Sequence, residues 1–176
     1  MYTEFEEGLV DTNTWGWVGS GILVYRAPGD IFLGMRSMHV TPPSLYGLPG
    51  GQVPLAKRNN LRDIRLSAVQ EFYEEVGVKL DDSLYLDRFF VYPDSDLFIA
   101  IDESEDILSA YNAQGEYAQY FVFLYQAPDR LANVSNNTTI SAPNWENDYF
   151  LWLNLDSIPY DECVDGLEAE ITGLVD

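Results

Sequence analysis

The chain has 176 residues, of which 47% are hydrophobic and 14% aromatic, enough for one packed domain spanning residues 1–176. Its formal net charge of −20 repels polyanions, so we expect no extended nucleic acid as a partner. No apolar run approaches the length of a membrane-spanning helix. The single cysteine, Cys163, excludes an intrachain disulfide, and the acidic start of the chain lacks the basic and apolar parts of a signal peptide. We therefore expect a cytoplasmic protein.

Apolar runs bounded by Gly and Pro predict a mostly β core. We expect strands at residues 16–27, 30–37, 84–93, 96–102, 117–127 and 149–155. The Pro- and Gly-rich residues 41–54 are expected to form a loop, with further long surface loops at 103–116 and 128–147. A short acidic helix is expected after residue 160.

Residues 61–77 are predicted to form the main helix. Either Asn60 or Asp63 is expected to cap its start, and Gly77 suits the left-handed residue that follows a helix. The helix carries an apolar stripe at helical spacing, made of Leu61, Ile64, Ala68, Phe72 and Val76.

Three glutamates, Glu71, Glu74 and Glu75, stand at i, i+3 and i+4 near the end of this helix. They share one face beside the apolar stripe, where like charges repel one another and the helix dipole disfavours them. A divalent cation would reverse this balance, and a site with only oxygen ligands suits Mg²⁺ or Mn²⁺. The alternative is an acidic, solvated helix face without a ligand.

The sequence "LPGG" at 48–51, followed by "QEFYEEVGV" at 70–78, resembles the signature of the Nudix hydrolase superfamily. The matching residues are Gly51, Glu71, Phe72, Glu74, Glu75, Gly77 and Val78. The resemblance implies the Nudix α/β/α sandwich (an α/β, or α+β, fold), with a mixed β-sheet and a loop-helix-loop motif.

A second segment, residues 142–159, has the spacing Glu-x-Asp-x-aromatic-x-Trp, at Glu146, Asp148, Phe150 and Trp152. It resembles a segment of the RNA pyrophosphohydrolases and diadenosine polyphosphate hydrolases of this superfamily. In those enzymes the glutamate supplies a further metal ligand or a base.

The signature is not complete in this chain. Five extra residues separate Gly51 from Gln70, and Gln70 replaces an arginine that helps to orient the glutamates in the family. The first glutamate of the signature has no counterpart, because Arg62 stands at its distance from Gln70.

The resemblance implies Mg²⁺ or Mn²⁺ held by Glu71, Glu74, Glu75 and Glu146, with Glu74, Glu75 and Glu146 also acting in catalysis. The implied reaction is hydrolysis of a nucleoside diphosphate linked to another group. A small nucleotide such as a dinucleoside polyphosphate or a nucleoside triphosphate is the expected substrate, and nucleotide sugars and ADP-ribose stay open. A homodimer is common in the family, although no interface can be identified from the residues.

Candidate substrate contacts are Arg36, Tyr46, Gly50, Gly51, Lys57 and Arg58. The basic residues Lys57, Arg58, Arg62 and Arg65 form either an anion grip or ordinary solvated charge. For stacking on a base, the candidates are Tyr46, Tyr149 and Phe150, although the favoured interpretation of each is a residue that fills the core or a strand. The only histidine, His39, is expected in a loop without a catalytic role.

Two other hypotheses remain. A non-catalytic Nudix-like binding or sensor domain is favoured by Gln70 and by the missing first glutamate. An unrelated acidic interaction protein is disfavoured, because the glycine turn and the glutamate helix occur together.

Overall fold

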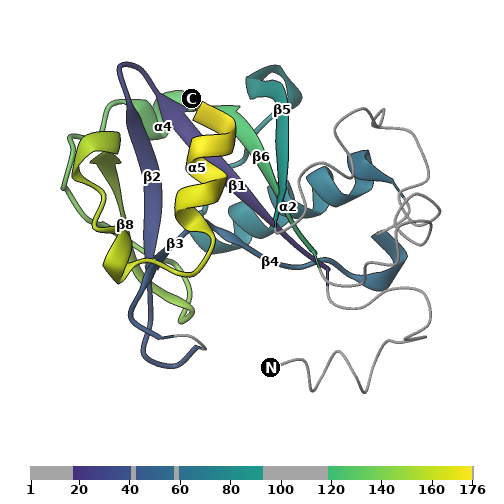
Figure 1. Cartoon of the computed structure of the whole chain (residues 1–176), viewed down its shortest axis with the longest axis horizontal. Coiled ribbons are helices and arrows are strands. Elements are labelled where there is room, and N and C mark those ends of the chain that lie inside the picture. Colours follow the sequence, from purple (N-terminus) through teal and green to yellow (C-terminus); the bar gives the residue numbers. More distant parts are fainter. Residues whose placement is uncertain (1–17, 41–42, 58–59, 93–118, 176) are drawn as a thin grey trace.

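The computed structural model describes residues 18–40, 43–57, 60–92 and 119–175, which form one mixed sheet with helices on both of its faces (Figure 1). The strands are β1 (Val18–Arg26), β2 (Asp30–Arg36), β3 (Tyr46–Gly47), β4 (Gly50–Gln52), β5 (Tyr85–Tyr92), β6 (Gln119–Gln126), β7 (Ile140–Ser141) and β8 (Asn147–Asn154). The α-helices are α2 (Leu61–Val76), α4 (Asp129–Ala132) and α5 (Leu167–Val175). Short 3₁₀ turns are η1 (Leu55–Lys57), η2 (Asp82–Leu84), η4 (Leu155–Ser157) and η5 (Tyr160–Glu162).

The sheet has the order β5-β6-β1-β2-β8-β7, and β1 pairs in parallel with β6. β1 and β2 pair only close to their turn, at Tyr25 with Ile31 and Arg26 with Asp30. Beyond that point the two strands diverge, and each takes a new partner: β4 joins β1 and β3 joins β2. The divergence brings the glycine pair of β4 alongside β1, on the face where α2 packs.

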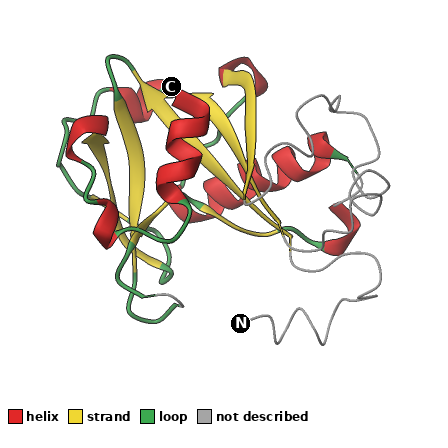
Figure 2. Ribbon diagram, in the orientation of Figure 1, coloured by secondary structure: helices red, strands yellow, loops and turns green. Residues whose placement is uncertain are grey.

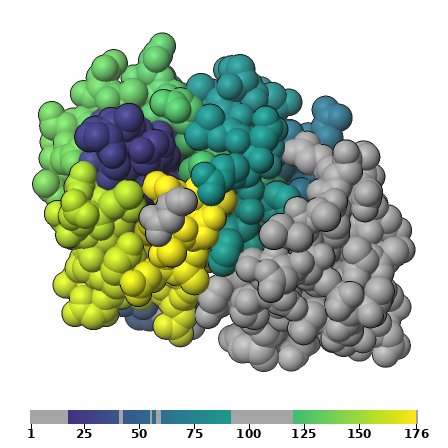
Figure 3. Space-filling view, turned by 45° about the horizontal axis from the view of Figure 1, so that its top comes forward, coloured from purple at the N-terminus to yellow at the C-terminus, as the bar shows by residue number. Residues whose placement is uncertain are grey.

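Two hydrophobic cores lie on opposite faces of the sheet. Along β1 the side chains alternate, so that Val18, Ile22 and Val24 join the core under α2 while Leu23 joins the core under α5. In Figure 2, α5 lies across the near face of the sheet and α2 lies behind it. In the space-filling view of Figure 3, the C-terminal residues of α5 (yellow) lie between the residues that precede them (yellow-green) and the residues around β5 (teal). The prediction of an α/β/α sandwich with a mixed sheet is confirmed.

Arg26 fixes the segment that follows β6. Its guanidinium donates to the carbonyls of Ala132 (2.9 Å) and Val134 (2.6 Å) and lies 4.3 Å from the ring centroid of Trp152. The prediction that 128–147 is all loop is therefore wrong, since α4 and β7 lie within it. Both elements are too short to show a periodic pattern, and long-range contacts hold them in place.

The predicted loop at 41–54 is also partly wrong, because it contains β3 and β4. Glycines carry no side-chain pattern, so neither strand could be distinguished from a loop. The predicted strand at 96–102 and the predicted loop at 103–116 lie outside the described residues. Among the described helices, none is long and apolar enough to cross a membrane.

Helix α2 starts and ends close to where the sequence predicts. Of the two candidate caps, Asn60 is the one used: its side-chain oxygen accepts from the backbone N–H of Asp63 at 2.8 Å. At the other end Gly77 has φ 83° and donates its backbone N–H to the Tyr73 carbonyl at 2.9 Å. The left-handed glycine ends the helix directly after the glutamates and turns the chain away from them.

Replacing Gly77 by alanine is expected to lower the free energy of unfolding by about 1 kcal/mol, because a Cβ is strained at positive φ. Denaturant unfolding monitored by circular dichroism measures this difference. Gly29→Ala is the matched control, since its Cβ would lie at an ordinary 3.6 Å from Leu155 Cδ1. If Gly77→Ala costs no more than Gly29→Ala, the left-handed cap contributes nothing.

Candidate active site

Glu75 lies at the centre of the site and connects three elements. It is only 4% exposed, although it is a carboxylate. One of its oxygens, Oε2, accepts from the backbone N–H of Gly50 at 3.2 Å, and Oε1 accepts from the side-chain amide of Asn147 at 3.0 Å. The end of α2 is thereby tied to β4 on one side and to the start of β8 on the other.

The two glycines of β4 allow this close approach. A Cβ on Gly51 would lie 3.2 Å from the carboxylate carbon of Glu71, so Glu71 packs directly against the strand backbone. A Cβ on Gly50 would lie 2.1 Å from the Ser20 carbonyl oxygen, which is a clash. The structure thus places Gly50 and Gly51 at the carboxylates, where their lack of a side chain is required.

The surroundings of Glu71 and Glu75 disfavour a negative charge on either side chain. Burial, then the charges of Glu146 and Glu71, raises the pKa of Glu75 to about 8, although the hydrogen bonds from Asn147 and Gly50 oppose this. Burial, then the charges of Glu74 and Glu146, also raises the pKa of Glu71, while a hydrogen bond with Glu75 lowers it. The charge of Glu146 therefore acts on both Glu71 and Glu75, and that of Glu74 acts on Glu71.

Glu74 and Glu146 form the exposed side of the site. Gln70, at the position of the family's arginine, donates its side-chain amide to Glu74 Oε2 at 2.9 Å. Asn144 donates to the Glu74 backbone carbonyl at 3.2 Å and accepts from the Glu146 N–H at 2.9 Å. The segment that carries Glu146 is thus attached to the end of α2 through Asn144.

The donor set fits a hard divalent cation in its chemistry. It consists of carboxylate oxygens that are partly buried and repel one another, and a cation would relieve both costs. Within the described ranges, however, no three His, Cys, Asp or Glu side chains are gathered closely enough to hold an ion. Glu71 and Glu75 are already in contact, so a cation would be held once Glu74 and Glu146 rotate towards them, which their exposure permits.

The basic cluster of residues 57–65 does not act as one anion grip. Arg65 is buried, donates to Asp82 (3.1 Å) and to the Tyr125 hydroxyl (2.8 Å), and lies 4.4 Å from the Tyr85 ring centroid. Its part in the predicted anion grip is wrong, because its charge is used to hold α2 against the sheet. Arg58 lies outside the described residues.

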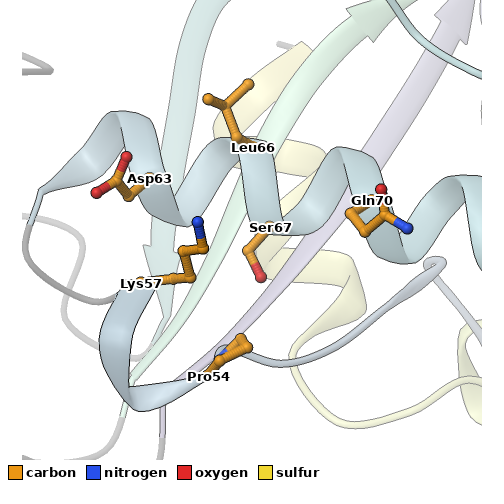
Figure 4. A pocket seen from close by; sticks show the side chains of 6 residues that line it. All are labelled: Pro54, Lys57, Asp63, Leu66, Ser67 and Gln70. Atoms are coloured by element: carbon orange, nitrogen blue, oxygen red, sulfur yellow. The ribbon is translucent and has the colours of Figure 1, made fainter.

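Lys57 is exposed and lines a cavity of about 320 Å³ between the turn η1 and α2. Figure 4 shows the side chains around this cavity, with Lys57 and Pro54 on the turn and the others on the helix. The full lining is Pro54, Lys57, Asp63, Leu66, Ser67 and Gln70. Pro54 and Lys57, which lie between the glycine pair and α2, therefore contribute one wall of a hollow that reaches Gln70, the partner of Glu74.

The three aromatic candidates for base stacking pack into or against the two cores. Phe150 is fully buried and stacks on Phe32 with ring centroids 5.5 Å apart, so its proposed role in base stacking is wrong. Tyr46 and Tyr149 pack against the α5 core. A hydrogen bond with Tyr149, followed by burial, raises the pKa of Tyr46 to about 12.

Arg36 and His39 lie at the end of β2 and just beyond it. Arg36 is half-buried at the irregular end of the β2–β8 pairing, and its charge opposes the rise in the pKa of the buried Tyr120. His39 is exposed in the turn after β2, as expected for a loop residue.

Two buried polar residues, one at the site and one in α5 on the opposite face of the sheet, could not be identified from the sequence. Asn147 carries no signal of its own between Glu146 and Asp148, yet it is buried and donates to Glu75. Glu170, in the first turn of α5, is only 4% exposed, and burial raises its pKa to about 8. Nothing in the acidic C-terminal sequence distinguishes Glu170 from the exposed Glu168.

No protein-family model matches the chain, and no curated protein matches it. Solved structures do match. A MutT NUDIX hydrolase from Burkholderia pseudomallei is similar to this chain at 19% identity and a TM-score of 0.55, over 90% of this chain and 97% of that one. The chain has the Nudix fold.

Two further structures with this fold differ in length. The Nudix hydrolase RenU from M. smegmatis matches at 17% identity and a TM-score of 0.55, over 89% of this chain and 80% of that one. A bifunctional NMN adenylyltransferase/ADP ribose pyrophosphatase from Francisella tularensis, in complex with AMP and a Mn ion, matches at 18% identity and a TM-score of 0.54. That match covers 97% of this chain but only 44% of the bifunctional enzyme.

The buried Glu170 predicts a pH-dependent stability. Because burial raises its pKa in the folded state from 4.5 to about 8, its favourable contribution is complete below about pH 4.5 and is lost as the pH rises to about 8. Glu170→Gln should therefore raise the free energy of unfolding by about 2–4 kcal/mol at pH 9 and leave it nearly unchanged at pH 4. Denaturant unfolding at both pH values measures the difference.

The matched control is Glu168→Gln on the exposed side of α5. It removes the same charge without removing a buried carboxylate. Equal effects of the two substitutions at pH 9 would mean that overall charge, and not the burial of Glu170, sets the pH dependence.

Proposed function

We propose that the chain is a divalent-cation-dependent pyrophosphohydrolase that cleaves a nucleoside diphosphate linked to another group. The observation that carries this proposal is the contact between the half-buried Glu71 and the buried Glu75, which Gly50 and Asn147 hold in place, with the charges of Glu74 and Glu146 acting on them. Folding alone gains nothing from placing Glu71 and Glu75 where burial and the charges of neighbouring glutamates disfavour their own charge. Cation binding gives the cluster a function.

The four glutamates would hold Mg²⁺ or Mn²⁺. When bound, such an ion neutralises the diphosphate oxygens and makes water a better nucleophile. Glu75 cannot move far, because both of its oxygens are engaged by protein donors, so it fixes the position of the site. Glu146 is exposed and can accept a proton from the attacking water, as a general base does.

Other residues of the chain would bind the substrate around this cluster. Arg36 supplies a guanidinium for a phosphate at the end of β2. Gly50 and Gly51 bring the backbone of β4 against the glutamates, and this backbone is a further proposed contact for the substrate. Lys57 supplies a positive charge in the cavity that reaches Gln70, and Arg58 and Tyr46 remain proposed contacts as well.

A small nucleotide is the proposed substrate and partner. The net charge of −20 disfavours long polyanions, which leaves dinucleoside polyphosphates and nucleoside triphosphates as the leading classes. ADP-ribose joins them, because one structure with the same fold is an ADP ribose pyrophosphatase in complex with AMP and a Mn ion. The solved structures offer no support for the narrower likeness to RNA pyrophosphohydrolases and diadenosine polyphosphate hydrolases.

A second candidate is a nucleotide-binding domain without catalysis. It is favoured by Gln70, which gives Glu74 a neutral partner in place of an arginine, and by Arg62 at the position of the first glutamate. It is also consistent with the finding that, among the residues that the structure describes, no three His, Cys, Asp or Glu side chains lie close enough together to hold an ion. The first candidate predicts turnover of a nucleotide, and the second predicts binding without turnover.

Phosphate release from a panel of nucleotides with Mg²⁺ or Mn²⁺ tests the proposal. The panel contains diadenosine polyphosphates, nucleoside triphosphates, ADP-ribose and nucleotide sugars. The wild-type protein should cleave at least one of them. The products then yield inorganic phosphate when they are treated with a phosphatase. Glu75→Gln should reduce the rate by a factor of at least about 100, because a ligand of the metal is removed.

Glu168→Gln, on the far side of the sheet, is the control and should keep the wild-type rate. Full activity of Glu75→Gln would contradict the assignment of the metal site. Binding of a nucleotide by the folded wild-type protein with no release from any compound would support the non-catalytic candidate.

A further inference from the structure

Ser20 is a buried hydroxyl that the proposed chemistry has not used. It lies in β1 and is 0% exposed. Within the part of the chain that the structure describes, its Oγ is the one buried side-chain N or O atom without a hydrogen-bond partner. A hydroxyl in this condition destabilises the folded protein, so its presence calls for a function.

The position of Ser20 follows from the strand register. Val18 and Ile22, two residues away on either side, face the core under α2, so Ser20 faces α2 too. Ser20 is paired with Gly51 of β4, and side chains directly opposite each other lie on the same face, with Cβ atoms about 4.5–5.5 Å apart. The Cβ position of Gly51 is 3.2 Å from the Glu71 carboxylate carbon. The Ser20 side chain and the Glu71 carboxylate therefore lie on the same face of the sheet, both adjacent to Gly51, which has no side chain to separate them.

The chemistry of the two groups is complementary. A hydroxyl can donate one hydrogen bond, and an ionised carboxylate can only accept. In the structure Glu71 is hydrogen-bonded to Glu75 instead. Once the carboxylates turn towards a cation, Glu71 needs another donor on its inner side, and Ser20 is fixed there by the strand.

We propose that Ser20 is a positioning residue of the carboxylate site, whose hydroxyl donates to Glu71 when the glutamates hold a divalent cation. This inference rests on the proposed function. The donor is kept without a partner in the metal-free protein and becomes satisfied on cation binding. Through Ser20, cation binding thus fixes the orientation of the Glu71 carboxylate.

Ser20→Ala tests this inference, because a stability role and a positioning role predict opposite results. Without metal, the Tm of Ser20→Ala should equal that of the wild type or exceed it by about 2–4 °C, since an unpartnered buried hydroxyl is removed. The stability control is Ser37→Ala. Ser37 is also buried, but its Oγ accepts from the His39 N–H at 3.2 Å, so its loss should lower the Tm.

With Mn²⁺ present, the Ser20→Ala substitution should be unfavourable. The rise in Tm that Mn²⁺ gives the wild type should be smaller in Ser20→Ala, and kcat should fall by a factor of about 10–100 with little change in KM. This range is typical when a group that orients a metal ligand is removed.

Two results would overturn the inference alone: an unchanged Mn²⁺ response with unchanged kcat, or a metal-free Tm that falls as it does in Ser37→Ala. A wild-type protein that shows neither a Tm rise with Mn²⁺ nor turnover would overturn the inference together with the proposed function. The wild-type measurements therefore distinguish the two failures.

Discussion

The burial of the Glu75 carboxylate is the constraint on which the rest of the site depends. The Gly50 N–H and the Asn147 amide each bind one of its oxygens, so one side chain holds α2, β4 and β8 together. This arrangement requires β1 and β2 to diverge beyond their turn, because β4 reaches the helix only through that opening. The carboxylate cluster thus depends on the sheet topology that brings β4 to the end of α2.

The local parts of this arrangement could be predicted from the sequence. The helix, its cap at Asn60 and its end at Gly77 depend on neighbours within one or two turns, and so does the spacing of the glutamates. The features that the sequence did not predict depend on contacts between distant segments. Arg65 looks like surface charge until Asp82 and the Tyr125 hydroxyl are placed beside it. The amide that fixes Glu75, and the two short strands in the glycine-rich segment, could be found only in the folded chain.

The site shows how a protein can keep a destabilising arrangement at the place where it acts. Burial raises the pKa of both Glu71 and Glu75, and Ser20 leaves a hydroxyl without a partner beneath them. Each of these features disfavours the free protein and would be relieved by a cation. The two extensive cores on either side of the sheet supply the stability that such a cluster removes.

Direct binding of Mn²⁺, measured by calorimetry or by electron paramagnetic resonance, tests the central claim most directly, since it needs neither a substrate nor turnover. The account predicts that the wild-type protein binds Mn²⁺ at a defined site and that Glu75→Gln weakens this binding strongly, while Glu168→Gln leaves it unchanged. Equal Mn²⁺ affinity in Glu75→Gln and the wild type would contradict the claim that the buried carboxylates form a cation site.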